Sequence, residues 1–528
     1  MHIIYNANIF TQEPDNPHAR AMIIDNGRIV ATGEDTAMIS AAPANAQKTN
    51  LDGKVIWPGL IDAHIHLETY AESLQFVDCE TETRQECLDR VAERARKTPE
   101  EAWIRGHGWN QNNWPQGGFG NAHDLDQAAA SQPVYLTAKS LHAAWANTLA
   151  LQKAGISAAT PDPKGGMIVR DSSGQPTGIL LESAMELVEE VIPNASNQEV
   201  SQQILEAQTQ LWKMGITGVH DYDPVSCFSA LQILQEHGKL HLRVVKGVPH
   251  EVMPHAIATG LRTGYGNEFL RIGAVKLFAD GALGPRTAAM LAPYENETEY
   301  SGFPFLDAEQ IYEIGQDAVR NGLSLATHAI GDRANHEVIN AYAQLRAFET
   351  NQNLPHFRHR IEHVQLLHPN DINRLAQYQI IASMQPIHAP SDMQMADRHW
   401  GARSAYAYAW NSLLSNKTLL AFGSDAPVES PNPFWGIYSA VTRRRLDGQP
   451  GSQGWYPEQR ISLQEALNAY TLGPAFAAGN EDCQGKLAAG YYADFIVLDR
   501  DPFSIPVVDL AALQPKATMV AGEWVWQS

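Results

Sequence analysis

Two histidines, His64 and His66, stand two positions apart at the end of an apolar run that begins at Val55. The run is rich in β-branched and aliphatic residues and is interrupted by Pro58 and Gly59, which is typical of a short strand buried on both faces. Residues i and i+2 of a strand point to the same side, so both imidazoles would face one point and could hold one ion. Taken alone, the stretch favours a structural role, as two partly buried histidines at a strand end.

Four further side chains that could do chemistry also follow apolar runs: Lys276, His328 in ATHAIGD, His363 in RIEHVQ and Asp425 in FGSDAPV. A polar side chain buried without a partner is costly, so this repeated placement points to a shared site. Four histidines and one carboxylate suit Zn²⁺ or a similar borderline divalent metal. Each residue alone could be a core histidine or a capping aspartate, but the complete set predicts a metal site.

Lys276 differs from the other candidates, because a protonated ammonium repels cations. Burial beside a metal lowers the pKa of a lysine, and the neutral amine can then take up CO₂. The resulting carbamate is an anion whose two oxygens can bridge two metal ions. The alternative is a buried Lys276 that is paired with Asp280.

The elements that must position these residues are eight strand-like runs, separated mostly by helical stretches. The runs cover residues 55–65, 215–223, 240–249, 270–281, 323–332, 358–367, 380–389 and 419–428. Alternating strands and helices predict a parallel sheet, and eight strands can close a (β/α)8 barrel. The polar residues stand at the C-terminal ends of the strands, which form the active-site face of such a barrel.

The two ends of the chain both read as short strands joined by turns, which predicts one β domain built from both termini. Residues 70–205 are too long for a loop and contain elements of their own. We therefore expect a β domain of residues 1–57 and 480–528, a barrel of residues 58–69 and 206–479, and an inserted subdomain of residues 70–205 at the barrel mouth.

Composition limits the classes of partner. The 528 residues carry 38 Lys and Arg against 59 Asp and Glu, a net charge of −21, which argues against nucleic acid or an anionic membrane as the main partner. The cysteines Cys79, Cys87, Cys227 and Cys483 show no CxxC spacing and predict free thiols in a reducing compartment. The sequence lacks a signal-peptide pattern and a long apolar run, so a cytoplasmic location is expected.

Seven stretches resemble one known group of proteins. They are PGLIDAHIHL, GGMIVRDSSGQPTGILLE, VKLFADGALGPRTAAM, THAIGDRAN, RIEHVQ, FGSDAPVESPNPFWGIYSAVTR and GKLAAGYYADFIVLDRDP. In this order they resemble the amidohydrolase superfamily, and within it the amidohydrolase-3 branch of YtcJ-like and N-substituted-formamide-deformylase-like proteins. The resemblance implies an α/β fold: a distorted TIM (β/α)8 barrel with a composite β-sandwich from both termini and an inserted α+β subdomain.

The resemblance also implies roles for the six candidate residues. His64 and His66 would hold the more buried metal, and His328 and His363 would hold a second metal. Lys276 would bridge the two metals, and Asp425 would touch metal and move protons. One departure lies in the insert, where relatives often show a charged run like R-x-D-G-H and this chain has AKSLHAAWAN. His142 is kept without the neighbouring Arg and Asp, which leaves the substrate open.

Five residues are substrate-binding candidates: Trp109, His142, Asp280, Arg286 and Gln385. Trp109 lies in a Gly-rich stretch with the polar and aromatic groups of a recognition loop, or it belongs to a Trp-rich loop packed on its own core. His142 could polarise a substrate carbonyl or cap a helix. Gln385 ends the seventh strand, and Arg286 could contact substrate or be an exposed arginine paired with an acid.

These parts predict hydrolysis of a non-peptide C–N bond, linear or cyclic, in a small-molecule substrate. Metal-activated hydroxide would attack, Asp425 would act as general acid/base, and His328 would help to polarise the oxygen. One or two divalent ions are expected, with zinc as the first choice, and a homodimer is compatible with the resemblance. The alternatives are ester or other hydrolysis at the same metal site, or a non-catalytic relative that acts as a scaffold.

Overall fold

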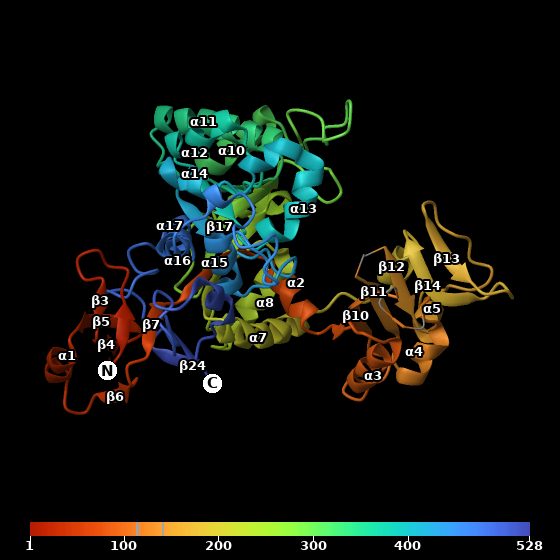
Figure 1. Cartoon of the computed structure of the whole chain (residues 1–528), viewed down its shortest axis with the longest axis horizontal. Coiled ribbons are helices and arrows are strands. Elements are labelled where there is room, and N and C mark those ends of the chain that lie inside the picture. The colour runs from red at the N-terminus through yellow and green to blue at the C-terminus, as the bar shows by residue number, and fades with distance from the viewer. Residues whose placement is uncertain (112–113, 116, 140–141) are drawn as a thin grey trace. The chain divides into compact units, whose positions relative to one another are not determined.

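The computed structural model describes residues 1–111, 114, 115, 117–139 and 142–528. The chain divides into two compact units, Met1–Tyr70 with Val200–Ser528 and Ala71–Glu199. The first unit contains the barrel and the β-sandwich, and the second is the inserted segment (Figure 1). Over the described residues, no helix combines the length and the apolar character needed to cross a membrane.

Eight parallel strands form the barrel sheet, and they lie side by side in the order in which they occur along the chain. They are β8 (Leu60–Ile65), β15 (Ile216–Asp221), β16 (Arg243–Pro249), β17 (Leu270–Phe278), β18 (Leu325–Ala329), β19 (Arg360–His363), β20 (Ile381–Met384) and β21 (Leu420–Phe422). Each predicted run contains one of them. The expected α/β class with a distorted barrel is confirmed.

Helices of this unit follow most of the barrel strands. They are α2 (Leu67–Ser73), α7 (Asn197–Lys213), α8 (Val225–Glu236), α9 (Met253–Ala258), α10 (Ala308–Arg320), α11 (Asp332–Asn351), α12 (Ile372–Gln377), α13 (His388–Trp400), α14 (Trp410–Ser415), α15 (Pro433–Thr442), α16 (Leu463–Ala469) and α17 (Leu472–Ala478). Helix α10 begins at a capping box, in which Asp307 and Gln310 each accept the other's backbone N–H.

The first and last barrel strands are joined where both end. Asp425 N donates to His64 O at 2.7 Å, and His66 N donates to Ala426 O at 2.9 Å. Gly423 permits this approach, because a β-carbon there would lie 2.4 Å from the backbone nitrogen of His64. We call this junction between β8 and the segment after β21 the seam.

The expectation of one strand from Val55 to Ile65 is wrong. The run divides at Gly59 into β7 (Val55–Pro58), which joins the sandwich, and β8, which joins the barrel. A β-carbon at Gly59 would lie 2.3 Å from Oγ1 of Thr217, so only glycine fits against the neighbouring strand. One apolar run thus supplies two different sheets.

The sandwich is built from both ends of the chain, which appear in red and blue in Figure 1. One sheet has the order β5–β4–β1–β6 and the other β24–β23–β22–β7–β2–β3. Their strands are β1 (His2–Tyr5), β2 (Asn8–Phe10), β3 (His18–Ala19), β4 (Ala21–Asp25), β5 (Arg28–Gly33), β6 (Gln47–Asn50), β22 (Phe495–Leu498), β23 (Ala517–Val520) and β24 (Glu523–Gln527), with β7; helix α1 (Asp35–Ala41) follows β5. Buried Arg243 of β16 joins barrel and sandwich, because its Nε and Nη2 donate to Asp494 at 2.5 and 2.9 Å.

The insert has its own six-stranded sheet, in the order β13–β14–β12–β11–β10–β9. Its elements are β9 (Val77–Asp78), β10 (Ile104–Trp109), β11 (Val134–Ala138), β12 (Ala143–Ala146), β13 (Gly166–Arg170), β14 (Pro176–Glu182), α3 (Arg84–Ala95), α4 (Ala122–Ala128), α5 (Thr148–Lys153) and α6 (Glu186–Glu189). Trp109, Trp114 and Trp145 are buried against one another in its core.

Candidate metal centre

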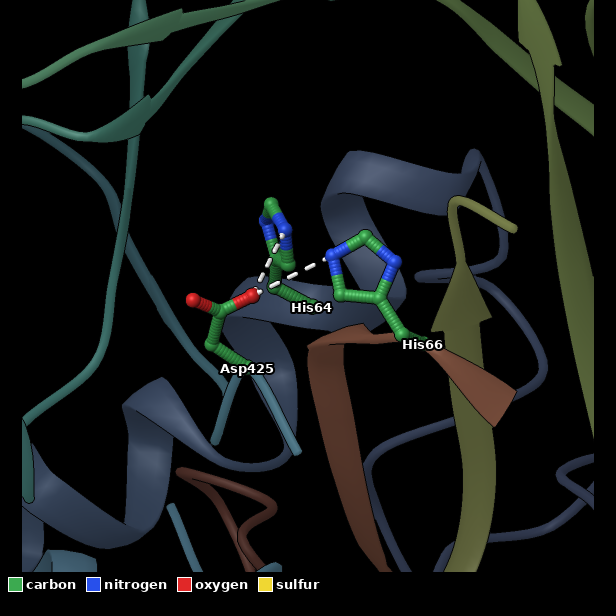
Figure 2. A group of neighbouring side chains, drawn as sticks. All are labelled: His64, His66 and Asp425. Atoms are coloured by element: carbon green, nitrogen blue, oxygen red, sulfur yellow. Dashed lines mark ion pairs between the residues drawn. The ribbon is translucent and has the colours of Figure 1, made fainter. Parts of the chain in front are cut away.

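His64 and His66 lie at the end of β8 and face Asp425 across the seam (Figure 2). Nε2 of each histidine is 3.4 Å from the same atom, Oδ1 of Asp425. These three side chains offer ligand atoms that all lie within 4.8 Å of one another. The i, i+2 spacing therefore does what the sequence predicts: it brings two imidazoles to one point.

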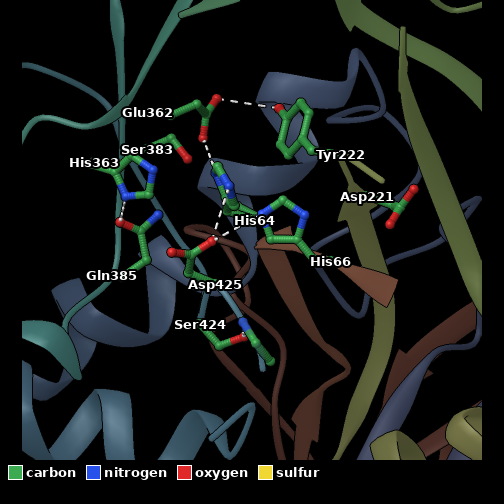
Figure 3. Close-up of polar contacts among 12 residues, drawn as sticks. His64, His66, Asp221, Tyr222, Glu362, His363, Ser383, Gln385, Ser424 and Asp425 are labelled. Atoms are coloured by element: carbon green, nitrogen blue, oxygen red, sulfur yellow. Dashed lines mark hydrogen bonds and ion pairs between the residues drawn. The ribbon is translucent and has the colours of Figure 1, made fainter. Parts of the chain in front are cut away.

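A carboxylate holds the far side of each of these rings. Nδ1 of His64 donates to Oε2 of Glu362 at 2.6 Å (Figure 3). Nδ1 of His66 donates to Oδ1 of Asp223 at 3.0 Å. With the proton on Nδ1, each Nε2 presents a lone pair, as metal-ligating histidines do. Nε2 of His64 is buried and has no hydrogen-bond partner among the described residues. The donor set therefore fits a divalent metal.

Glu362 is fixed from three directions. It accepts from His64, it forms an ion pair with Nε of Arg360 at 2.5 Å, and Tyr222 donates to its Oε1 at 3.3 Å. Burial opposes ionisation, but Arg360 and His64 hold the pKa of Glu362 well below its usual range. The carboxylate behind His64 is therefore favoured in its charged form and is held by three contacts.

Asp425 is both charged and strained. Burial alone would raise its pKa, but the hydrogen bond from His66 and the nearby His64 and His363 hold the pKa well below its usual range. Its backbone lies in the left-handed region, with φ of 61°. Such a conformation in a non-glycine residue occurs where the surroundings impose it, often at functional sites.

His66 lies between two carboxylates, Asp223 and Asp425. Burial disfavours the imidazolium, but both hydrogen-bonded carboxylates favour it and raise the pKa of His66 to about 10. Without metal, the proton on His66 balances this negative charge. A bound cation would do the same, so metal and proton compete for this place.

A second group of donors lies on the other side of Asp425. Ligand atoms of His363, His388 and Asp425 also lie within 4.8 Å of one another. Nδ1 of His363 donates to Oε1 of Gln385 at 2.8 Å, which leaves its Nε2 for a ligand. His363 has a φ of 73°, another left-handed non-glycine residue.

His328 lies beside His363, with ring centroids 4.5 Å apart. Its Nε2 donates to the carbonyl of Gly281 at 2.9 Å, so its Nδ1 carries a lone pair. Burial, and then the charge of Lys276, lowers the pKa of His328 to about 3. This neutral tautomer suits a metal ligand and cannot donate from Nδ1 to a developing oxyanion.

Lys276 is almost completely buried, and burial lowers its pKa to about 8. The described residues give its Nζ no hydrogen-bond acceptor and no ion-pair partner, so the alternative pairing with Asp280 is not found. The rings of Tyr222 and Phe278 lie 4.9 Å from Nζ. The charges of Glu362 and Asp425 oppose the lowering of the Lys276 pKa, but burial outweighs them.

A cavity of about 320 Å³ opens onto these side chains. Its apolar wall includes Leu283, Ile330 and Met395, and its polar wall includes Gln365 and Glu429. A neighbouring cavity of about 470 Å³ shares some of its lining side chains. The shared side chains are His66, Lys276 and Phe278.

Two of the substrate-binding candidates lie behind the ligands. Gln385 is buried and holds His363. Asp280 is buried and accepts the backbone N–H groups of Ala289, Ile330 and Gly331. Burial raises the pKa of Asp280 to about 7, although these bonds oppose the rise. Asp280 thus fixes the backbone of the loops around the site.

The other three candidates contact residues that are not candidate ligands. Arg286 forms an ion pair with Glu297 at 2.6 Å, which is the alternative that the sequence left open. Trp109 lies in the core of the insert, where its Nε1 donates to the carbonyl of Leu136 at 2.8 Å. His142 is largely exposed on the insert, and its Nδ1 lies 3.0 Å from Oε2 of Glu182.

Sequence reasoning missed three residues of the site: Glu362, Asp223 and His388. They lie in or just after three of the predicted strand runs, in the stretches RIEHVQ, GITGVHDYD and IIASMQPIHA. The same signal, a polar residue at the end of an apolar run, could have found them. What the sequence does not contain is the pairing of Glu362 with His64, 298 positions away.

Comparison with known proteins yields similar proteins over nearly the whole chain. A model of the amidohydrolase family matches residues 47–526. The protein YtcJ of Bacillus subtilis is 34% identical over 98% of this chain and 98% of its own length. N-substituted formamide deformylase of Arthrobacter pascens is 28% identical over 98% of this chain and 97% of its own. A crystal structure of a metal-dependent hydrolase from Pyrococcus furiosus has a TM-score of 0.79 and 28% identity, covering 95% of this chain and 100% of that one.

Proposed function

This chain belongs to the amidohydrolase family of metal-dependent hydrolases, and we propose that it cleaves an amide-like C–N bond, linear or cyclic, in a non-peptide small molecule. One observation carries the proposal. The Nε2 atoms of His64 and His66 face one oxygen of Asp425 while a buried carboxylate holds each Nδ1. Such rings are oriented for a cation beside a cavity large enough for a small substrate.

The residues of the first donor group would hold a divalent ion, and imidazole with one carboxylate favours zinc. When bound, the ion would supply a Lewis acid that polarises a carbonyl and acidifies water. Glu362 and Asp223 would keep the rings of His64 and His66 from turning. Without these carboxylates each imidazole could adopt the other tautomer and lose its ligand lone pair.

Asp425 would move the proton. Its low pKa keeps it ionised at neutral pH, so a carboxylate oxygen is ready to accept a proton from the attacking water. The same oxygen would then return the proton to the leaving nitrogen, which needs it to depart as an amine. The apolar wall of Leu283, Ile330 and Met395 would exclude bulk water and bind an apolar substituent.

A carbamate on Lys276 is proposed as an additional bridge between two ions. Its buried amine would attack CO₂ and lose one proton, which forms an N–C bond and an anion with two oxygens. The lack of a hydrogen-bond or ion-pair partner for Nζ among the described residues supports this proposal, because burial lowers the pKa of the amine more than the nearby charges of Glu362 and Asp425 raise it.

The first substrate class to test is N-substituted formamides, because the Arthrobacter pascens relative is named for them. The experiment combines elemental analysis of the purified chain with a panel of an N-alkyl formamide, a cyclic amide and an ester of similar size. Formate or amine release, lost after chelation and in Asp425→Asn, would support the proposal.

Two other outcomes would contradict the proposed hydrolysis of a C–N bond. Cleavage of the ester alone would move the activity to C–O bonds at the same site. Absence of metal after reconstitution with zinc, iron or manganese would overturn the hydrolase proposal for this chain and favour a scaffold role.

A further inference from the structure

The turn between β20 and α13 presents two polar side chains to the site. Gln385 accepts from His363, and three residues later His388 begins the helix, with its backbone N donating to the carbonyl of Gln385 at 3.1 Å. This short hydrogen-bonded turn fixes both residues relative to His363. The ring planes of His363 and His388 are 15° apart, with centroids separated by 6.5 Å.

His388 lacks the contact that a buried imidazole normally makes. Its Nε2 is buried without a hydrogen-bond partner among the described residues, although the ring lines the 320 Å³ cavity. Buried polar atoms are almost always paired, so an orphan on a side chain that lines a cavity points to a missing ligand. Since the ligand atoms of His363, His388 and Asp425 lie within 4.8 Å of one another, the missing ligand fits a cation.

Asp425 has a separate oxygen for each side. Oδ1 faces His64 and His66, and Figure 3 shows the other carboxylate oxygen on the side of Gln385 and His363. One carboxylate can thus serve two neighbouring donor groups. This arrangement places His388 among the donors of the second group.

We propose that His388 is a metal ligand, which holds a second divalent ion together with His363 and Asp425. The proposal rests on the proposed function, because it assumes that the first donor group also binds metal. It assigns a ligand to a residue beyond strand β20, which neither the spacing of the histidines nor the resemblance predicts. Two imidazole nitrogens and a carboxylate oxygen are a donor set for zinc or cobalt.

The test uses the full chain, stripped with a chelator and reconstituted with Co²⁺ or Zn²⁺. Elemental analysis gives the number of bound ions, and the visible absorption of Co²⁺ reports the ligands of each ion. The variants are His388→Ala and His388→Gln, where glutamine keeps a polar group of similar reach. His399→Ala on the same helix is the matched control, because its ring contacts Tyr294 outside the cavity. Circular dichroism verifies that each variant is folded.

We expect two ions in the wild type and in His399→Ala, and one ion in both His388 variants, with the affinity for the second ion lowered at least tenfold. Retention of two ions in both His388 variants, with an unchanged Co²⁺ spectrum, would overturn the inference and leave the proposed function intact. A wild-type chain that binds one ion under all conditions would also overturn it. A chain that binds none would remove the proposed function as well.

Discussion

Nδ1 of His64 lies 2.6 Å from Oε2 of Glu362, and both side chains are almost completely buried. The same type of buried contact recurs away from the metal centre, where Nε2 of His359 lies 2.8 Å from Oε1 of Glu349. The two buried Glu–His pairs have equivalent chemistry but different surroundings. They therefore allow the metal-related role of one pair to be separated from a structural role.

Glu362→Gln should weaken metal binding about 10- to 100-fold, because it removes the charged acceptor that orients His64. Glu349→Gln should lower the stability of the fold and leave the metal affinity unchanged. Metal titration of the two folded variants checks this. Equal metal affinity in both would show that Glu362 only balances the charge of Arg360.

His64→Ala should abolish binding of the first ion and reduce hydrolysis by at least about 1000-fold, since one of three ligands is lost. His359→Ala removes an equally buried imidazole outside the metal centre, so this variant should bind metal as the wild type does. Elemental analysis and rate measurements on both variants decide the matter. Full metal content in His64→Ala would contradict the ligand role.

Lys276→Ala should lower the metal content from two ions to one if a carbamate bridges them. Elemental analysis of protein expressed with and without added bicarbonate measures this. One ion in both wild type and variant, with unchanged activity, would identify Lys276 as a structural residue.

The stability of the chain should fall in mild acid through His359. Leu325 N donates to Nδ1 of His359 at 3.1 Å, so the buried ring is neutral with its proton on Nε2, and burial lowers its pKa below 6.5. In the unfolded chain His359 therefore binds a proton near pH 6.5, whereas in the folded chain it binds that proton only at a lower pH. The stability that the neutral ring contributes above about pH 6.5 is lost progressively as the pH falls below that value.

Urea unfolding of wild type and His359→Gln at pH 8.0 and 5.5 isolates this contribution. Glutamine can replace the two hydrogen bonds and does not titrate, so the variant should lose less stability between the two pH values. Parallel losses in both proteins would exclude His359 as the cause.

Arg243→Met should destabilise the fold by about 3–5 kcal/mol, because Asp494 would remain as a buried, unpaired charge between barrel and sandwich. The double variant Arg243→Met, Asp494→Asn should recover part of this loss. Denaturant unfolding of both variants measures the difference. No recovery would mean that the shape of Arg243, and not its charge, holds the contact.

The sequence allowed the barrel strands to be predicted, because each combines an apolar run with a polar residue at its end. It also identified His64, His66 and Asp425, which the structure brings together. It did not separate β7 from β8, although Pro58 and Gly59 interrupt the run, because the close approach of Gly59 to Thr217 is visible only in the folded chain. Contacts of this kind arise between strands that are distant in sequence.

The supporting groups were harder to predict for a related reason. The partner of Arg286 is Glu297, only 11 positions away, yet its exposed ion pair could not be distinguished from a substrate contact by residue type. The partners of His64 and His66 come from other strands, and a single sequence contains no record of such pairs. Burial and orientation, which decide the role of His388, exist only in the folded chain.

The seam has a consequence for how the protein is made. Ser424 and Asp62, which are hydrogen-bonded across the seam, are 362 positions apart in the sequence. His64 and His66 therefore leave the ribosome long before Asp425 is synthesised. Strands β22 to β24 of the sandwich are synthesised later still. Domains commonly fold in order as they emerge, but here neither the barrel nor the sandwich can be completed early. The proposed ion would therefore find its complete site only late in synthesis, because a nascent chain stalled before residue 425 carries the two histidines without the third member of their site.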